Sequence, residues 1–508
     1  MNNRTHKVRN SIPRIIFVAL AVLLQVAWLM ALVLRFNTYS NWIAAASTII
    51  ALVVVVRLYS KHTSPAFKLP WIMLIMALPV MGLALYLMVE VFSDLGSFRK
   101  RMAALVQQRQ QRIPQNPEIP GKLDPDCAGY SRYLQQIGGA PVYENTAVTY
   151  YPEAVQAFEA MKQELEKAES FIFMEYFIVE DGSSFREILE ILERKVKAGV
   201  EVRLMYDDLG SVGYVNLRFA KSLVDRGIRC QVFNPALPVV NLFMNHRDHR
   251  KITVIDGKVG FSGGYNLADE YFDRRRRPYG KWKDTGVRLE GEAVRSLTAF
   301  FLEMWAASSG RPENFDTYLN ISHSVPGTGF VQPFADDPQS RERLAENTYL
   351  HLIYNARDYL YIITPYLIIT DEMVNALGLA ARRGVDVRII TPGIPDKKTV
   401  YQVTRSYYGG LAQQGVRIYE YTPGFCHAKQ CVCDGRYATI GTSNLDYRSF
   451  YHHFENDILL MDCDAVKQIE ADFRELFPQC REVTEKYCSG KKHMLLIQCL
   501  LRLIAPLM

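Results

Sequence analysis

Two dense groups of polar residues in the C-terminal part of the chain have types and spacing that could do chemistry. The first lies in HRKITVIDGKVGFSGGYN (249–266) and the second in HAKQCVCDGRYATIGTSN (427–444). Corresponding positions are 178 residues apart throughout. Since a purely structural explanation must account for the same spacing twice, we interpret both groups as functional. The shared residues are His249, Lys251, Asp256, Gly263 and Asn266 in the first group, and His427, Lys429, Asp434, Gly441 and Asn444 in the second.

This pattern predicts a site for a phosphodiester. Residues two apart on a strand point to one face, so each histidine is expected beside its lysine. The Asp-Gly pair predicts a turn, and the glycine-rich return would bring the asparagine back beside the lysine. If the two groups meet, their lysines and amides could hold the non-bridging phosphate oxygens. Two histidines then suffice as nucleophile and acid, with no metal and no cofactor.

The elements that must position these groups are repeated as well. GVEVRLMYDD (199–208) is visibly like GVDVRIITPG (384–393). Apolar runs rich in β-branched residues alternate with amphipathic stretches, which is typical of an α/β sheet. We therefore predict one module of about 180 residues written twice, over 146–325 and 326–508. The expected order is strand 171–179, helix 184–198 and strand 200–206, then strand 360–368, helix 371–383 and strand 385–391.

The nine cysteines are sparse for 508 residues, and their odd number argues against a complete disulfide framework. Most are expected to be free thiols. Cys426, His427, Cys431 and Cys433 could also be zinc ligands, because thiolate and imidazole suit that metal. We favour the phosphodiester interpretation of His427, which does not use the cysteines.

The N-terminal region differs from the rest in composition. The whole chain is 49% hydrophobic and 22% charged, with a net charge of +6, as in a soluble protein. However, apolar residues concentrate in 15–34, 42–59 and 71–89. A stretch of about 20 apolar residues is long enough to cross a hydrocarbon core of about 30 Å. We therefore expect residues 1–92 to form a transmembrane anchor of two or three spans.

Two of these apolar stretches allow an interpretation other than a simple membrane span. The first follows four basic residues, as a signal peptide does, but it exceeds the usual apolar region of such a peptide, which favours an uncleaved anchor. The third contains Pro79 and Gly82 and is either a span or a kinked hairpin. Basic residues before and after these stretches predict opposite orientations in the membrane. The side of the membrane on which the C-terminal part lies is therefore left open.

Residues 93–145 are polar, with Gln and Arg concentrated at 107–112 and four prolines after them. This composition predicts a linker that begins as a surface helix. The helix is either solvated or lies on anionic lipid.

The paired HxK(x)4D motifs resemble those of the phospholipase D superfamily, and the resemblance spans about 146–508. Within it, KLPWIMLIMALPVMGLALY (68–86), WKDTGVRLEGEAV (282–294) and SNLDYRSF (443–450) resemble bacterial cardiolipin synthases. The resemblance implies an α/β fold of two pseudo-symmetric phospholipase D-like lobes, each a mixed sheet flanked by helices, after the N-terminal transmembrane helices.

The resemblance also implies roles for the motif residues. His249 would attack phosphorus and form a phosphohistidine, and His427 would act as acid and base, although the near symmetry leaves their order open. Two buried-looking glutamates outside the motifs, Glu175 and Glu455, could orient the histidines. The phosphate oxygens would be held by Lys251, Lys429, Asn266 and Asn444, while Asp256 and Asp434 would orient the motifs by hydrogen bonding.

The function implied by the resemblance is a cardiolipin synthase, which transfers a phosphatidyl group from one phosphatidylglycerol to another and releases glycerol. We expect a multi-pass protein of the bacterial cell membrane whose partners are anionic phospholipid and the membrane, not nucleic acid. A hydrolytic phospholipase D and a nuclease are the alternatives within the superfamily, and the choice between transfer and hydrolysis depends on exclusion of water. An inactive lipid-binding module predicts decay in one motif, whereas both are intact.

Overall fold

The computed structural model describes residues 41–61, 64–92, 96–235, 245–274, 279–489, 501–503 and 505–507, with scattered residues between 16 and 31. More than half of the predicted span at 15–34 therefore lies outside the described residues.

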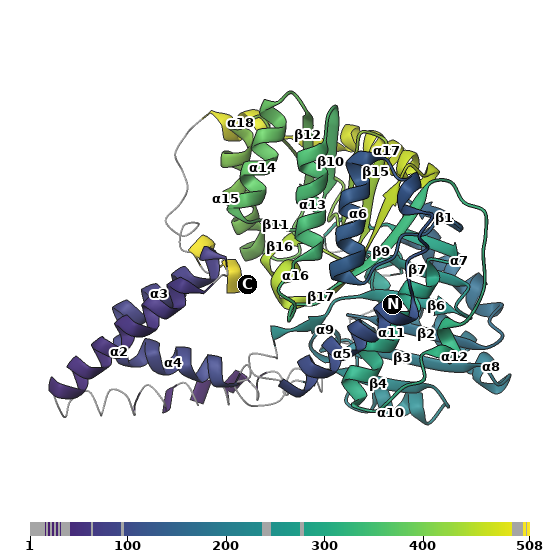
Figure 1. Cartoon of the computed structure of the whole chain (residues 1–508), viewed down its shortest axis with the longest axis horizontal. Coiled ribbons are helices and arrows are strands. Elements are labelled where there is room, and N and C mark those ends of the chain that lie inside the picture. The colour runs from purple at the N-terminus through teal and green to yellow at the C-terminus, as the bar shows by residue number, and fades with distance from the viewer. Residues whose placement is uncertain are drawn as a thin grey trace, which may run out of the picture.

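Two mixed sheets form the centre of the molecule (Figure 1). The first has the order β1-β8-β7-β6-β2-β3-β4. Its strands are β1 (Thr146–Tyr151), β2 (Phe171–Tyr176), β3 (Glu201–Asp207), β4 (Arg229–Phe233), β6 (Lys251–Ile255), β7 (Val259–Gly263) and β8 (Gly286–Gly291). Strands β2, β3 and β4 are parallel, whereas β6, β7, β8 and β1 continue the sheet in antiparallel pairs.

The second sheet repeats this order. From one edge it runs β9-β17-β15-β14-β10-β12-β13-β18. Its strands are β9 (Phe330–Asp336), β10 (Tyr359–Ile363), β12 (Asp386–Pro392), β13 (Arg417–Tyr421), β14 (Gln430–Cys433), β15 (Tyr437–Gly441), β17 (His453–Met461) and β18 (Cys480–Glu482). A short strand of the first half, β5 (Arg247–Asp248), pairs with β17 and so links the two sheets next to the first motif.

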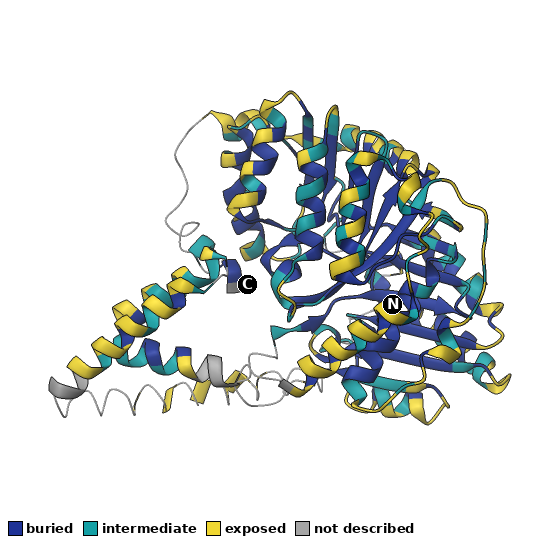
Figure 2. Ribbon diagram, viewed as in Figure 1, coloured by how far each residue is buried: buried dark blue, intermediate teal, exposed yellow. Residues whose placement is uncertain are grey.

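Helices flank both sheets in corresponding places. In the first half they are α7 (Ala154–Glu166), α8 (Ser183–Lys197), α10 (Phe219–Val224) and α11 (Val294–Ser309), and in the second α13 (Leu344–Asn355), α14 (Asp371–Arg382), α15 (Lys398–Ala412) and α17 (Asp464–Leu476). One apolar core contains side chains of both halves, among them Phe301 of α11 and Phe473 of α17. The central strands of both sheets are buried, whereas the edge strands β1, β4 and β18 are partly exposed and the helices expose their outer faces (Figure 2).

The expected α/β fold is confirmed, and the predicted elements agree closely with β2, α8, β3, α14 and β12. The expected strand 360–368 is instead divided into β10 and a short β11 (Leu367–Ile368). The interruption contains Pro365, which has no backbone N–H to donate to a neighbouring strand.

The segment expected to be a linker packs against the globular body. It contains α5 (Gly96–Arg112), which packs against α11, and α6 (Pro125–Gly138), which packs against β9 and α13. Phe98 and Met102 of α5 are buried in the shared core. Arg109 is buried as well, with Nε 3.3 Å from a carboxylate oxygen of Glu303. The Arg and Gln content predicts a surface helix, and most of α5 is exposed, but its residues Phe98, Met102 and Arg109 are buried against protein.

The N-terminal helices project from the body (Figure 1). The predicted span 42–59 coincides with α2 (Asn41–Ser60), whereas 71–89 is divided between α3 (Pro65–Ala77) and α4 (Pro79–Phe92). These two form an antiparallel hairpin, since Gly82 lies against the backbone of Leu74 and Ile75, and the ring of Tyr86 is 5.6 Å from that of Trp71. In the part of the chain that the structure describes, no helix has both the length and the apolar character needed to cross a membrane.

Candidate active site

Each motif histidine lies just before a central strand of its sheet. His249 precedes β6, and His427 lies three residues before β14. The expectation that histidine and lysine project from one strand face was too simple, because the histidines are outside the strands. Instead each lysine turns back: Lys251 Nζ donates to the His249 carbonyl oxygen at 2.6 Å, and Lys429 Nζ donates to that of His427. Lys429 Nζ also lies 2.8 Å from His427 Nδ1.

Asp256 and Asp434 hold the far ends of these strands. Both adopt left-handed backbone conformations, with φ of 53° and 52°, and a glycine follows each in the turn. Each carboxylate accepts three backbone N–H groups at the start of the neighbouring strand. About five residues of strand, or roughly 17 Å, separate Asp256 from the histidine end. The donors are Glu169, Ser170 and Phe171 for Asp256, and Arg357, Asp358 and Tyr359 for Asp434.

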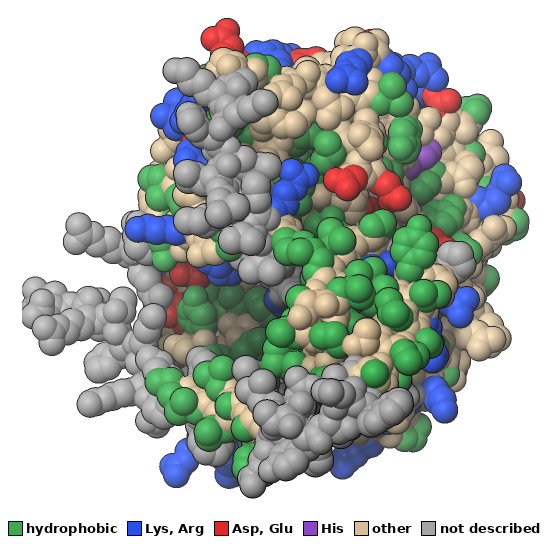
Figure 3. Space-filling view, turned by 90° about the vertical axis from the view of Figure 1, so that its left-hand side faces the viewer, with side chains coloured by type: hydrophobic (Ala, Val, Ile, Leu, Met, Phe, Trp, Pro, Cys, Tyr) green, Lys and Arg blue, Asp and Glu red, His purple; other side chains and the backbone are tan. Residues whose placement is uncertain are grey.

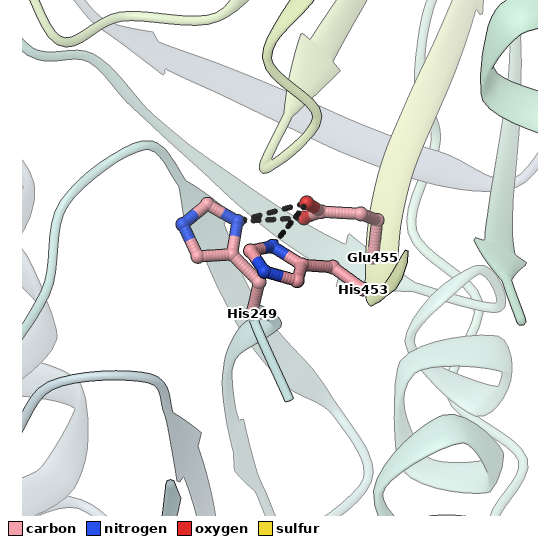
Figure 4. Close-up of side chains that lie close together, drawn as sticks. All are labelled: His249, His453 and Glu455. Carbon is pink, nitrogen blue, oxygen red and sulfur yellow. Dashed lines mark hydrogen bonds and ion pairs between the residues drawn. The ribbon is translucent and has the colours of Figure 1, made fainter. Parts of the chain in front are cut away.

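Each histidine takes its carboxylate partner from the other half of the chain. Nδ1 of His249 lies 2.9 Å from both oxygens of Glu455, which is in β17 (Figure 4). Nδ1 of His427 lies 2.7 Å from Oδ2 of Asp284, which precedes β8. A carboxylate at Nδ1 keeps the proton on that nitrogen and leaves Nε2 free to react.

Asp284 was missed by the sequence analysis, although the duplication contains a signal for it. Gly263 pairs with Gly286 in the first sheet, and its counterpart Gly441 pairs with Asp457 in the second. Asp284 and Glu455 each lie two residues before these partners and so occupy equivalent positions. The chain between motif and carboxylate is longer in the first half, which shifts the numbering and hides the correspondence.

Glu175 does not have the position expected for it. It is buried in β2, with an oxygen 3.9 Å from Arg250 Nη1, and none of its described contacts is with a histidine. Burial, and then the nearby Asp248 carboxylate, raise the pKa of Glu175 well above its usual value. The charged groups beside it are Arg250 and Asp248.

The two motif asparagines have different surroundings. Asn266 Oδ1 accepts the backbone N–H of Ile178 at 3.1 Å, and its Nδ2 donates to the Tyr271 hydroxyl at 2.8 Å. The Tyr271 ring is 5.2 Å from that of His427, so Asn266 supports the site through this tyrosine. Asn444 is also buried, and its Oδ1 has no hydrogen-bond partner among the described atoms.

Burial controls the protonation of the site. It lowers the pKa of His249 well below its usual value and that of His427 to about 4, with Lys251 and Lys429 respectively adding to the effect. Burial also lowers the pKa of Lys251 to about 7 and that of Lys429 to about 8. Each motif histidine is hydrogen-bonded to a carboxylate of the other half, so the two motifs form one site. It contains two neutral imidazoles, each oriented by a carboxylate, beside two cations that lose their protons easily.

The cysteines considered as zinc ligands together with His427 do not lie around one point. All described cysteines are free. Cys431 and Cys433 face the core beneath α13, where Cys433 Sγ lies 3.8 Å from the Leu352 carbonyl oxygen. Cys426 belongs instead to the core shared by both halves. Because these side chains point into different cores, they cannot share an ion.

Comparison with known proteins identifies the family. The family described as "Cardiolipin synthase, PLD-like domain" matches residues 161–305 and 349–477, one segment around each motif. The chain belongs to this family. The segment 46–89 additionally matches the family described as "Phospholipase_D-nuclease N-terminal".

Relatives of this PLD-like family extend over most of the chain. A Streptococcus mutans protein described as uncharacterized is 44% identical over 86% of this chain and 96% of its own length. A cardiolipin synthase of Halalkalibacterium halodurans is 32% identical over 92% of this chain and 95% of its own. The crystal structure of a phosphatidylserine synthase from Haemophilus influenzae has the same fold, with a TM-score of 0.56 and 15% identity over 74% of this chain and 97% of that one.

Proposed function

We propose that this enzyme is a cardiolipin synthase that transfers a phosphatidyl group from one phosphatidylglycerol to the glycerol hydroxyl of another. The observation that carries the proposal is the similarity, over nearly its full length, to a cardiolipin synthase. The site supports transfer chemistry, because each imidazole has one ring nitrogen directed by a carboxylate from the other half of the chain.

In the first half-reaction we assign the attack to His249. Its Nε2 forms a bond to phosphorus, and the bond from phosphorus to the glycerol oxygen breaks. His427 takes up a proton at Nε2 as the anionic phosphodiester binds, and glycerol leaves as the alcohol after taking this proton. Glu455 stabilises the positive charge that develops on the His249 ring, and Asp284 does the same for protonated His427.

In the second half-reaction a hydroxyl of another phosphatidylglycerol gives its proton to His427 and attacks phosphorus. The bond between phosphorus and His249 breaks, and cardiolipin is released. Lys251 and Lys429, with the amide of Asn444, are assigned to the non-bridging oxygens throughout. Asp256, Asp434 and Asn266 support this arrangement through backbone and tyrosine contacts.

We propose that the N-terminal helices attach the enzyme to the membrane. We further propose that this region crosses the bilayer. Apolar side chains of α2 such as Val53 and Val56 are 62% and 69% exposed. Exposed apolar patches of this kind mark contact with a membrane or protein. Figure 3 looks at the side from which these helices project and shows hydrophobic side chains gathered there.

The same helices lead to the active site. Phe67 in the first turn of α3 packs against Tyr447 and Tyr451 of α16 (Tyr447–His452), with ring centroids 5.5 and 4.8 Å apart. The residue after α16 begins β17, which carries Glu455. A lipid surface at α2–α4 would therefore lie close to the catalytic histidines.

The proposal is tested with purified full-length protein in micelles that contain phosphatidylglycerol as the sole lipid substrate. We expect cardiolipin and free glycerol in equal amounts. Phosphatidic acid without cardiolipin would replace the synthase assignment with a hydrolytic one. His249→Ala serves as the inactive control.

A further inference from the structure

A third histidine lies in the active site, and neither motif contains it. His453 is the first residue of β17, and its ring is 5.1 Å from that of His249. Its Nδ1 lies 3.5 Å from Oε1 of Glu455. Figure 4 shows the two imidazoles on the same side of the Glu455 carboxylate. One nitrogen of each ring and one Glu455 oxygen all lie within 4.8 Å of one another.

The ring of His453 lacks the hydrogen bonds that a buried imidazole normally makes. Its side chain is 5% exposed, and neither ring nitrogen has a hydrogen-bond partner among the described atoms. Most buried polar side-chain atoms in native structures do have a partner, so the nitrogens of His453 require an explanation. The proposed transfer does not use this residue.

The donor set fits a transition-metal cation. Zn²⁺ binds imidazole nitrogen and carboxylate oxygen at about 2.0–2.2 Å, which places tetrahedral ligand atoms about 3.3 Å apart. The separations of 2.9 Å from His249 to Glu455 and 3.5 Å from His453 to Glu455 bracket that value. Both histidine side chains are buried, at 7% and 5% exposure, so few water molecules compete for their ring nitrogens.

We propose that His249, His453 and Glu455 form a binding site for Zn²⁺ or a similar divalent transition-metal ion, and that the bound ion inhibits the enzyme. The ion would replace the proton on His249 Nδ1 and would leave a fourth position for water. It would draw electron density from the ring, which weakens Nε2 as a nucleophile, and it would occupy the carboxylate that stabilises the charged ring. The inhibitory part rests on the proposed function, whereas the binding part does not.

The nearby lysines oppose a cation, and two carboxylates offset them. Lys251 and Lys429 act electrostatically on His249. Glu455 lies at Nδ1 of His249 and Asp284 at Nδ1 of His427.

The binding test uses purified full-length protein in detergent micelles, freed of metal with a chelator. Zn²⁺ is titrated at pH 8 by calorimetry, and Co²⁺ is titrated in parallel by its visible absorption. We expect one ion per chain and an absorption band typical of tetrahedral nitrogen and oxygen ligands. His453→Phe keeps an aromatic ring in place and should weaken binding at least tenfold, as should His453→Gln if the phenylalanine variant does not fold.

His323→Gln is the matched control, because His323 lies elsewhere, near Glu290. It should bind like the wild type. Equal binding by the His453 variants, or no stoichiometric binding by the wild type, would overturn the site. Binding without loss of activity would overturn the inhibitory role alone. Absence of any activity in metal-free protein would instead count against the proposed function and leave the binding result intact.

Discussion

Glu455 of the second lobe accepts the Nδ1 proton of His249 of the first lobe, with both carboxylate oxygens 2.9 Å from that nitrogen. Asp284 and His427 form the reciprocal pair in the opposite direction. Neither lobe therefore contains both a motif histidine and its carboxylate partner. The duplication gives one site because each copy orients the histidine of the other.

Removing the charge of either carboxylate should impair catalysis without unfolding the protein. We expect Glu455→Gln and Asp284→Asn each to lower kcat by about 10³-fold, because the neutral side chain no longer fixes the tautomer or stabilises the charged ring. Initial rates of cardiolipin formation and the melting temperature are the measurements. Glu290→Gln, in β8 but paired with Arg288, should keep near wild-type rates. A Glu455→Gln enzyme with more than a fifth of wild-type kcat would refute the assigned role.

The rate should fall on the alkaline side of neutrality. Burial lowers the pKa of Lys251 to about 7 and that of Lys429 to about 8, so raising the pH through this range removes the charges that hold phosphate. Burial holds the pKa of His249 well below its usual value, so its ring does not cause this fall. We therefore predict kcat/KM to fall progressively as the pH rises through 7 and 8. A profile that rises to pH 9 is incompatible with this assignment.

Lys251→Arg offers a control for the pH profile, since a guanidinium keeps its charge at every pH in this range. Where the variant retains activity, the falling limb should move to higher pH. An unmoved limb would show that Lys251 does not cause it.

Asp256 should matter for stability more than for chemistry. Its carboxylate accepts the N–H groups of Glu169, Ser170 and Phe171, and Asp256→Ala would leave these donors without that partner. We expect a loss of about 2–4 kcal/mol in the free energy of unfolding, from hydrogen bonds to a charged group. Asp256→Asn, which tolerates the left-handed backbone, should lose less. Urea denaturation measures both. Should the alanine variant unfold like wild type but lose all activity, Asp256 acts on substrate instead.

The α3–α4 hairpin depends on a glycine. A Cβ at Gly82 would meet the Leu74 carbonyl oxygen at 2.6 Å and the Ile75 Cα at 2.7 Å. Gly82→Val should therefore separate the two helices at a cost of about 1–3 kcal/mol, which faster hydrogen exchange in α3 and α4 would reveal. Gly129→Ala in α6, where a Cβ has nothing within 4 Å, is the matched control. Unchanged exchange in the valine variant would contradict the packing.

The sequence predicts this fold well because the same module is written twice. The repeated strings locate β3 and β12, and glycines with positive φ at 199 and 384 follow α8 and α14. The site is predicted less completely. Glu455 and the motif residues have local signals, but Asp284 depends on a strand register shared by the two sheets. The placement of Glu175 away from the histidines, and the burial of Arg109, arise from packing between segments distant in the chain.

The measurement that tests the central claim most directly is the identification of the covalent intermediate. We suggest His427→Ala with phosphatidyl-p-nitrophenol, a donor whose leaving group needs no acid, followed by an alkaline quench and mass spectrometry of the digest. We predict a phosphatidyl group on the peptide that contains His249. An enzyme that also carries Glu455→Gln should give no adduct within the same reaction time. An adduct elsewhere, or turnover to cardiolipin by a His249→Ala enzyme, would contradict it.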